Sequence, residues 1–292
     1  MASLAQGFRV MQKRKYRFSF YFNAAVLSGN SGRMIYDSFK IPYVIDYIDR
    51  WITPGYWKLP KSQRSLKQTL SNFLASALEP FVLKRASHLI AVSKGTTDCV
   101  LAPYPRLNRL GTSEIPYGAE AGDFEYLRKH PRANPFFDRN DGSFHMSCVG
   151  RGGSDVLPQI RAVFQTIREL LNRSPSVFSR LRLHFVGTTY AAQGNGQYQV
   201  LPLAEEMDLR NVVDERPGRV SYLDALQILI DSHALLAIGS NQPHYTASKI
   251  FPYILAKKPL LAVFRGESSV VKILGETKTG RLVTFGDRGL SG

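Results

Sequence analysis

A short segment late in the sequence places three anion-binding side chains directly before an amphipathic helix. Residues 244–264 read HYTASKIFPYILAKKPLLAVF, in which Thr246 and Ser248 supply hydroxyl donors and Lys249 a positive charge. Pro252 predicts that the helix begins near Ser248, because proline lacks a backbone donor and is tolerated in the first turn. The unpaired N–H groups and the dipole of a helix start attract anions such as phosphate. The alternative is an ordinary helix whose hydroxyl side chains only cap its end.

Glycines and polar residues also follow other apolar runs in the same half of the sequence. Glycine lets a phosphate approach the backbone, and arginine offers it a bidentate fork. If the runs are parallel strands, their carboxyl ends meet at one edge, where open sheets bind ligands. A tight turn would explain Gly187 alone, and neither GxxxxGK[ST] nor GxGxxG occurs. The candidate phosphate-binding residues at this edge are Gly150, Arg151, Gly152, Gly153, Gly187, Ser240, Thr246, Ser248 and Lys249.

Apolar, β-rich runs alternate with helix-like segments along the sequence. Helical periods occur at residues 157–171 and 222–230. Strands that alternate with helices predict parallel sheets covered on both faces, which is a doubly wound α/β fold. The expected strands lie at residues 18–27, 43–47, 88–92, 144–149, 181–186, 212–213, 234–238 and 260–264.

The expected strands form two sets. Residues 118–142 are rich in Pro, Asn, Asp, Arg and Gly and show no period, which is typical of a linker between lobes. Only one expected strand precedes the one at 43–47, so we expect an incomplete first lobe, either because the chain is a fragment or because this lobe is reduced. The expected division is a basic tail at 1–17, an N-terminal lobe at 18–125, a linker at 126–142 and a C-terminal lobe at 143–292.

Composition indicates a globular protein. The 292 residues are 44% hydrophobic and 11% aromatic, which suffices for a sizeable core and argues against disorder. No apolar window reaches the roughly 18 residues of a membrane span, and the N-terminus lacks the core of a signal peptide. We therefore expect a cytoplasmic protein. Cys99 and Cys148 lie far apart in apolar surroundings, which favours free thiols over a disulfide or a metal site.

The net charge of +15 is concentrated in the first half of the sequence. Residues 50–94 contain eight basic residues and one acidic residue, Glu79. Leucines and phenylalanines between positions 66 and 81 recur at spacings of three and four, which predicts an amphipathic helix with a basic side. Such a helix either lies on an anionic membrane surface or packs its apolar side on a sheet. The sequence has no signature of an RRM, KH or helix-turn-helix module, so we expect no specific nucleic acid partner.

These residues together resemble the family-four type of retaining glycosyltransferases, which have the GT-B architecture. The resemblance runs from about residue 43 to residue 274 and rests on the order of six segments. It implies two Rossmann-like lobes with a nucleotide-sugar donor held mainly by the second. The segments are IPYVIDYIDRW, RASHLIAVS, EIPYGAEAGDF, CVGRGG, LRLHFVGT and SKIFPYILAKKPLLAV.

The resemblance also implies roles for single residues. Arg151 matches the arginine that contacts the donor diphosphate, with Gly150 and Gly152 letting it approach, and Ser248 and Lys249 match the phosphate-facing helix start. The absence of a D-x-D motif fits a metal-independent reaction and no further cofactor.

The catalytic candidates depart from the family pattern. Asp49 follows the strand at 43–47 where the family carries His-Asp, but Ile48 replaces that histidine. His244 and Pro252 stand where the family has the two carboxylates of its E-x7-E motif, and proline cannot bind the donor ribose. His244 is therefore either a catalytic candidate or a histidine of a surface loop.

The expected function is transfer of a sugar from a nucleoside diphosphate sugar to a glycan or a lipid-linked acceptor, in the cytoplasm or at the inner face of a membrane. One alternative is another GT-B enzyme, such as a nucleotide-sugar epimerase. A second alternative is a non-catalytic nucleotide-binding module, which the two missing carboxylates favour.

Overall fold

The computed structural model describes residues 19–22, 26–53, 55–107, 109–191, 196–241, 246–286 and 289–291. Contacts divide the chain into two compact units, Met1–Pro116 and Tyr117–Gly292. The expected tail at 1–17 and His244 lie outside the described residues. No described helix has the length and apolarity that crossing a bilayer requires.

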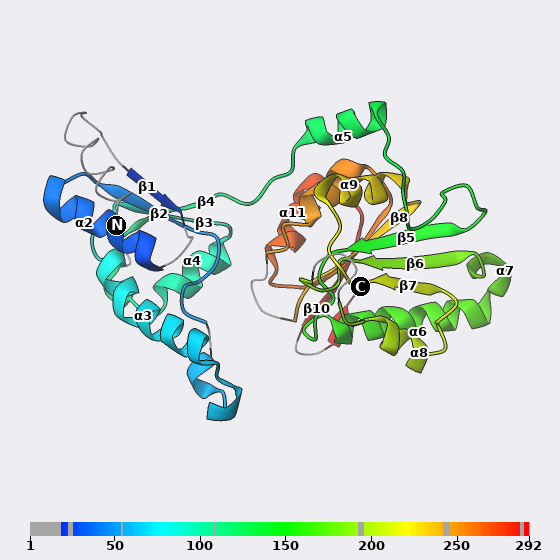
Figure 1. Cartoon of the computed structure of the whole chain (residues 1–292), viewed down its shortest axis with the longest axis horizontal. Helices are drawn as coiled ribbons and strands as arrows, with labels where there is room; N and C mark the ends of the chain where they lie inside the picture. The colour runs from blue at the N-terminus through cyan, green and yellow to red at the C-terminus, as the bar shows by residue number, and fades with distance from the viewer. Residues whose placement is uncertain are drawn as a thin grey trace. The chain divides into compact units, whose positions relative to one another are not determined.

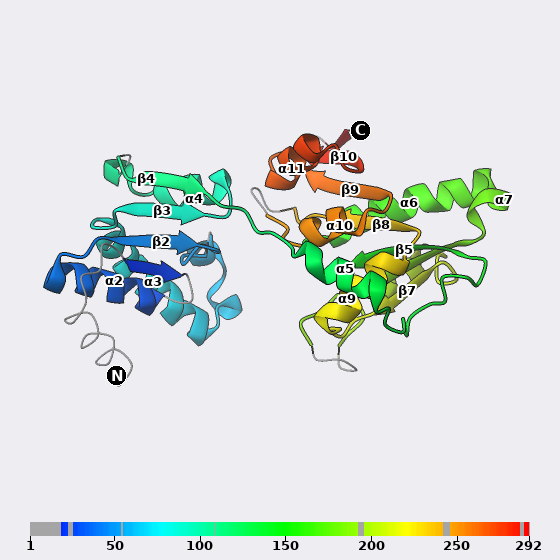
Figure 2. The same ribbon diagram turned by 90° about the horizontal axis from the view of Figure 1, so that it is seen from above.

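The first unit contains a parallel sheet of four strands in the order β1-β2-β3-β4, which lie side by side in Figure 2. Each strand is followed by a helix or a turn, as expected for a doubly wound lobe. The strands are β1 (Ser19–Phe22), β2 (Tyr43–Tyr47), β3 (His88–Ala91) and β4 (Gly111–Glu114), and the α-helices are α2 (Val26–Phe39), α3 (Leu66–Leu83) and α4 (Lys94–Leu101).

Two elements of this unit differ from the sequence-based prediction. The strand expected at 18–27 is wrong in its second half, because β1 ends at Phe22 and α2 begins at Val26. The buried Ile35 of α2 and the contact of Tyr36 with Tyr43 show that this segment packs as a helix. Strand β4 was not expected, since all four of its residues are exposed and carry no apolar signal.

Polar contacts fix how α3 packs on the sheet. The Tyr47 hydroxyl donates to Glu79 Oε1 at 3.1 Å and the Tyr104 hydroxyl to Glu79 Oε2 at 2.9 Å. Burial raises the pKa of Glu79, and these two hydrogen bonds oppose that rise. The Tyr43 hydroxyl donates to the Val82 carbonyl one turn further along α3. The side of α3 that faces the core therefore carries Glu79 and Val82.

The second unit contains a sheet of seven strands in the order β11-β10-β9-β8-β5-β6-β7. All neighbouring strands are parallel except β11, which pairs antiparallel with β10. The strands are β5 (Phe144–Val149), β6 (Leu181–Val186), β7 (Val213–Arg216), β8 (Ala234–Ile238), β9 (Leu260–Arg265), β10 (Arg281–Gly286) and β11 (Gly289–Ser291). The helices are α5 (Ala121–Lys129), α6 (Leu157–Arg173), α7 (Pro175–Phe178), α8 (Leu201–Glu206), α9 (Tyr222–Asp231), α10 (Ile250–Ala256) and α11 (Ser269–Thr277) (Figure 1).

The strand order reverses between β5 and β8. The chain moves outward through β6 and β7 and then outward on the other side through β8, β9 and β10. Since such crossovers are right-handed, the two sets of helices cover opposite faces. Leu236 and Ile238 of β8 accordingly pack with α6, whereas Leu235 and Ala237 pack with α9 and α10. The reversal creates a switch point at the carboxyl ends of β5 and β8, where open sheets bind ligands.

Helix α5 belongs to the second unit. Phe124 and Leu127, three residues apart, are buried in the core that α9 and α10 form. The Arg132 backbone N–H donates to Gln227 Oε1 at 3.0 Å, and its guanidinium pairs with Asp224 at 2.7 Å. The stretch in which we expected the linker is therefore held against the second unit, and the contact boundary lies earlier, at Pro116.

Candidate functional site

The turn after β5 brings Gly150 and Lys249 into contact. Gly150 has a φ of 136°, a backbone conformation that favours glycine. A Cβ atom at this position would lie 3.2 Å from Lys249 Cδ and 3.7 Å from its Nζ. The lysine side chain therefore crosses directly over the backbone of the turn, so the two segments meet as the sequence predicted.

Arg151 is oriented by an acidic residue on the same loop. Its Nη2 donates to Asp155 Oδ2, and Ser240 after β8 makes a further hydrogen bond to the same carboxylate. The Asn241 backbone N–H donates to the Asp155 carbonyl at 2.9 Å. Burial by itself would raise the pKa of Asp155, but the hydrogen bonds from Arg151 and Ser240 bring it below its usual 3.8. Asp155 thus joins the loops after β5 and β8.

Two cations meet at this edge. Burial lowers the pKa of Lys249, Arg151 lowers it further, and Cys148 and Asp155 oppose the decrease. A second anion beside Lys249 would relieve this unfavourable environment, because a nearby negative charge favours the protonated amine. Arg151 keeps about a third of its side-chain surface exposed and can still donate to a ligand. The pair is suited to bind an oxyanion such as a diphosphate.

The loops after β5 and β6 pack closely. The Gly152 N–H donates to the Thr188 carbonyl at 2.9 Å, and a Cβ on Gly152 would lie only 3.0 Å from Thr188 Cβ. Gly187 has a φ of 72°, and a Cβ added there would meet no atom within 4 Å, so its turn conformation rather than crowding requires glycine. A Cβ on Gly153 would lie 2.8 Å from the Arg151 guanidinium.

A buried carboxylate that the sequence did not reveal holds the loop after β6. Glu215, at the end of β7, accepts hydrogen bonds from the Thr188 hydroxyl and from the backbone N–H groups of Val200 at 2.8 Å and Leu201 at 2.7 Å. These N–H groups open α8, so its N-terminus already has an anionic partner. Helix α8 is therefore not a phosphate site, and its cap positions Thr188 beside Gly152.

Helix α10 begins at Ile250, two residues after the predicted start, and Pro252 lies in its first turn as expected. The Ile250 N–H donates to the Ala247 carbonyl at 3.1 Å, and the Phe251 N–H to the Ser248 carbonyl at 3.4 Å. These N–H groups are engaged by the preceding turn, so the side chain of Lys249 carries more of the anion-binding potential than the helix start itself.

The remaining candidates occupy different settings. The Thr246 hydroxyl accepts from the Ser269 hydroxyl at 3.1 Å, which ties its loop to α11. Ser248 is exposed, and Ser240 is buried against Asp155. Asp49 is exposed two residues after β2 in the first unit. The structure therefore gathers Gly150 to Gly153, Gly187, Ser240 and Lys249 at the carboxyl edge of the second sheet.

The described thiols and carboxylates do not form a metal site. Cys99 and Cys148 are free, as expected, and Cys148 is buried beneath Lys249. Burial raises the pKa of the Cys148 thiol. Among the residues that the structure describes, no group of three His, Cys, Asp or Glu side chains is placed to hold a metal ion.

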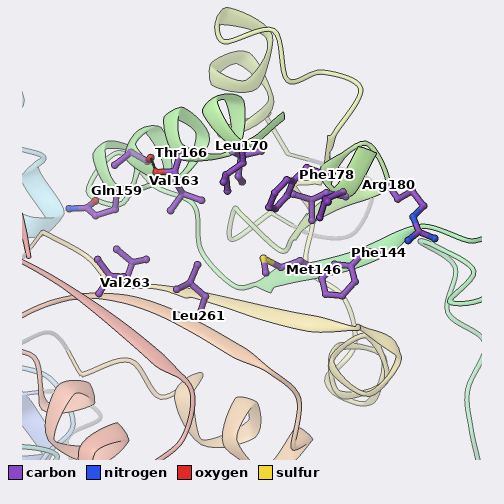
Figure 3. A pocket seen from close by; sticks show the side chains of 15 residues that line it. Phe144, Met146, Gln159, Val163, Thr166, Leu170, Phe178, Arg180, Leu261 and Val263 are labelled. Carbon is purple, nitrogen blue, oxygen red and sulfur yellow. Dashed lines mark hydrogen bonds between the residues drawn. The ribbon is translucent and has the colours of Figure 1, made fainter. Parts of the chain in front are cut away.

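The second unit also has an apolar pocket of about 630 Å³. It lies between α6, α7 and strands β5, β9 and β10 (Figure 3). The helices that follow β8 and β9 cross on the opposite face, and Leu261 and Val263 line the pocket on this one. Its lining contains none of the candidate phosphate-binding residues and is almost entirely apolar, so it is not the anion site.

Comparison with solved structures identifies the fold. HepE from Anabaena in complex with UDP matches with a TM-score of 0.59 and 16% identity, over 96% of this chain and 68% of its own. Sucrose-phosphate synthase from Thermosynechococcus elongatus matches at 0.57 and 14%, over 96% and 64%. A UDP-forming trehalose-phosphate synthase from Burkholderia xenovorans matches at 0.65 and 10%, over 97% and 66%. The chain thus spans about two thirds of the length of these proteins.

The architecture is therefore GT-B, as the sequence predicted. At identities this low the likeness establishes the fold only. No protein-family model matches the sequence, and no curated protein does.

The role of Asp155 is testable through pH. Because its pKa is lower in the folded protein than in the unfolded chain, the carboxylate contributes stability above about pH 4 and loses that contribution as the pH falls further. The free energy of unfolding of wild type should thus exceed that of Asp155→Asn at pH 6, and the difference should shrink between pH 4 and pH 2. Urea titrations at several pH values measure this. Asp98→Asn, which removes an exposed pair with Lys94, is the control. A difference independent of pH would contradict the assignment.

Proposed function

We propose that this protein is a glycosyltransferase that takes a sugar from a nucleoside diphosphate sugar bound at the carboxyl edge of the second sheet. The observation that carries this proposal is the contact of Lys249 with the Gly150 turn, beside an Arg151 guanidinium held by Asp155. Two positively charged side chains beside a glycine-rich turn, which a ligand can approach closely, are suited to bind a diphosphate. The GT-B fold, in which this edge belongs to an open parallel sheet, supports the same assignment.

The proposed mechanism is electrostatic. When the bond between the sugar and the diphosphate breaks, negative charge develops on the leaving phosphate oxygens. Donors that already point at those oxygens stabilise the transition state without having to reorganise. The hydrogen bond to Asp155 orients Arg151, and the contact with Gly150 positions the side chain of Lys249. We propose that these two cations act without a divalent metal and without a further cofactor.

The neighbours' own ligands suggest the nucleotide. HepE has been solved with UDP and with UDP-glucose, and the trehalose-phosphate synthase from Burkholderia xenovorans is a UDP-forming enzyme. We therefore propose a uridine diphosphate sugar as donor. For the acceptor, we propose a glycan or a lipid-linked saccharide that is reached from the cytoplasm, at a membrane surface whose contact is argued below.

A second function has one observation in its favour. His244 and Pro252 replace both carboxylates of the family's E-x7-E motif, so the group that would hold the donor ribose is unassigned. A chain that binds a nucleotide without turnover would have this property. Nucleotide binding is common to both functions, whereas transfer of sugar distinguishes them.

Removal of either cation should weaken diphosphate binding. Arg151→Ala and Lys249→Ala should each cost about 1.5 to 3 kcal/mol of UDP affinity, because each deletes a charge-assisted hydrogen bond. Affinity for uridine, which has no phosphate, should change little. Calorimetric titration measures both, with Arg161→Ala as the control, since Arg161 pairs with Glu206 on the exposed side of α6. Equal losses for UDP and uridine would show that the cations support the fold instead.

Asp49 is the proposed acidic residue at the donor sugar. Asp49→Asn should reduce turnover while changing donor affinity by less than about 1 kcal/mol, as expected for an interaction made chiefly in the transition state. The assay is release of UDP from the donor sugar in the presence of acceptor. Asp98→Asn, another exposed acid of the first unit, should leave turnover unchanged. Full turnover by Asp49→Asn would remove this residue from the mechanism.

A further inference from the structure

Helix α3 presents an apolar stripe to solvent. Leu66, Leu70, Phe73 and Leu74 follow the helical spacing i, i+4, i+7 and i+8 and therefore share one side of the helix. Leu66 is 90% exposed, Leu70 60% and Phe73 62%. We call these four residues the apolar stripe. Protein surfaces rarely gather large apolar side chains in this way without a partner.

The stripe is held outward by the opposite side of the same helix. The buried residues there are Asn72, Ala75, Glu79, Val82 and Leu83. The Asn72 side chain accepts from the Thr53 N–H at 2.8 Å, at the level of the stripe. Because buried polar groups would lose these partners if the helix rotated, the hydrogen bonds of Asn72 and Glu79 fix its orientation. The alternative from the sequence, in which the apolar positions pack on the sheet, is wrong for these four residues.

Two short helical turns, Tyr56–Lys58 and Lys61–Gln63, precede α3 and add two further apolar side chains. We call residues 56–64 the hook. The Arg64 guanidinium donates to the carbonyls of Trp57 and Leu59, both at 2.6 Å, and lies over the Trp57 ring at 5.7 Å. The buried Tyr56 hydroxyl contacts Thr69 Oγ1 at 2.7 Å, which joins the hook to the helix. Trp57 is 46% exposed and Leu59 40%. Figure 1 shows these short helical turns at the tip of α3.

The exposed charges of the segment that contains the stripe, residues 50–94, have one sign. Lys58 and Lys61 on the hook and Lys67 on the helix are exposed, and Lys84 and Arg85 follow the helix end. The one acidic residue of the segment 50–94, Glu79, is buried and faces the core. This segment therefore offers an exposed apolar stripe together with exposed cationic side chains.

We propose that the hook and the apolar stripe form the contact of this protein with an anionic lipid membrane. Leucine, phenylalanine and tryptophan would enter the boundary between headgroups and acyl chains, while the lysines would extend their ammonium groups to lipid phosphates and carboxylates. A symmetric dimer through this face would place two sets of cationic side chains together, which is unfavourable. This inference rests on the proposed function in one respect, because a lipid-linked acceptor would be bound at a membrane surface. Binding of the protein to a membrane does not itself require sugar transfer.

Tryptophan fluorescence provides a direct test with the full chain. The protein has two tryptophans, and Trp51 is buried whereas Trp57 is exposed. Vesicles of phosphatidylcholine with 30% phosphatidylserine should blue-shift the emission at 50 mM NaCl, and neutral phosphatidylcholine vesicles should not. Salt at 500 mM should weaken the effect, because it screens exposed charges. Trp57→Phe should abolish the shift.

Paired variants test the stripe and the charges by vesicle sedimentation. Leu70→Ser with Phe73→Ser should reduce the partition coefficient by more than about tenfold, because apolar area drives insertion. Lys61→Gln with Lys67→Gln should reduce it by about 25-fold, at about fivefold for each charge. Matched pairs in the second unit, Tyr190→Ser with Tyr198→Ser and Lys129→Gln with Lys272→Gln, also change exposed residues and should bind as wild type does.

Three outcomes would overturn the proposal. They are equal binding to neutral and anionic vesicles, wild-type binding by the stripe variant, and a dimer in sedimentation that the stripe variant converts to a monomer. UDP affinity measured on the same samples separates the two proposals. If a protein sample binds UDP but not vesicles, only the proposed membrane surface is contradicted. If it binds vesicles but not UDP, only the proposed function is contradicted.

Discussion

The geometry of the candidate site depends on one buried hydroxyl group. Tyr253 on α10 accepts a hydrogen bond from the Val149 N–H at 2.6 Å and donates one to the Val149 carbonyl at 3.1 Å. These two bonds fix the last residue of β5 relative to α10. Gly150 turns immediately after this point, and Lys249 immediately precedes α10, so their contact follows from it. Hydrogen bonds to a buried backbone are costly to leave unmade, and this joint is therefore well defined.

The sequence predicted the second sheet well because its central strands are buried on both faces. Strands β5, β6 and β8 lie at the predicted residues. Strand β8 is a continuous apolar run, and β5 and β6 are mostly buried although they include histidine, serine and arginine. Strand β4 was missed because it is exposed, and β1 was predicted too long because the residues before α2 are apolar as well. At the candidate site, the glycines, Arg151 and Lys249 could be predicted from the sequence, because each stands beside an apolar run or a predicted helix start. Glu215 and the hydrogen bond of Asp155 with Ser240 could not, since these contacts join segments that are distant in sequence.

The spacing of apolar residues in α3 predicted the helix but not the side that faces the core. The spacing of its leucines and phenylalanines predicted an amphipathic helix correctly, but the period does not say which side faces the core. Hydrogen bonds from Tyr47 and Tyr104 to Glu79 decide that the side of the helix that carries Glu79 packs inward. Those tyrosines come from β2 and from the segment after α4, so no local pattern contains the information. The exposed stripe is therefore a consequence of tertiary contacts that the sequence alone did not indicate.

Hydrogen exchange of backbone amides with and without UDP tests the central claim most directly. Ligand binding slows exchange where it restricts opening or covers N–H groups. Saturating UDP should protect the loops that follow β5, β6 and β8 and the turn before α10, with the strongest change between Gly150 and Gly153. Exchange rates in the loops that follow the strands of the first unit should change less on UDP binding. Protection confined to the first unit, or no protection at UDP concentrations up to the millimolar range, would contradict the assignment of the donor site to the second sheet.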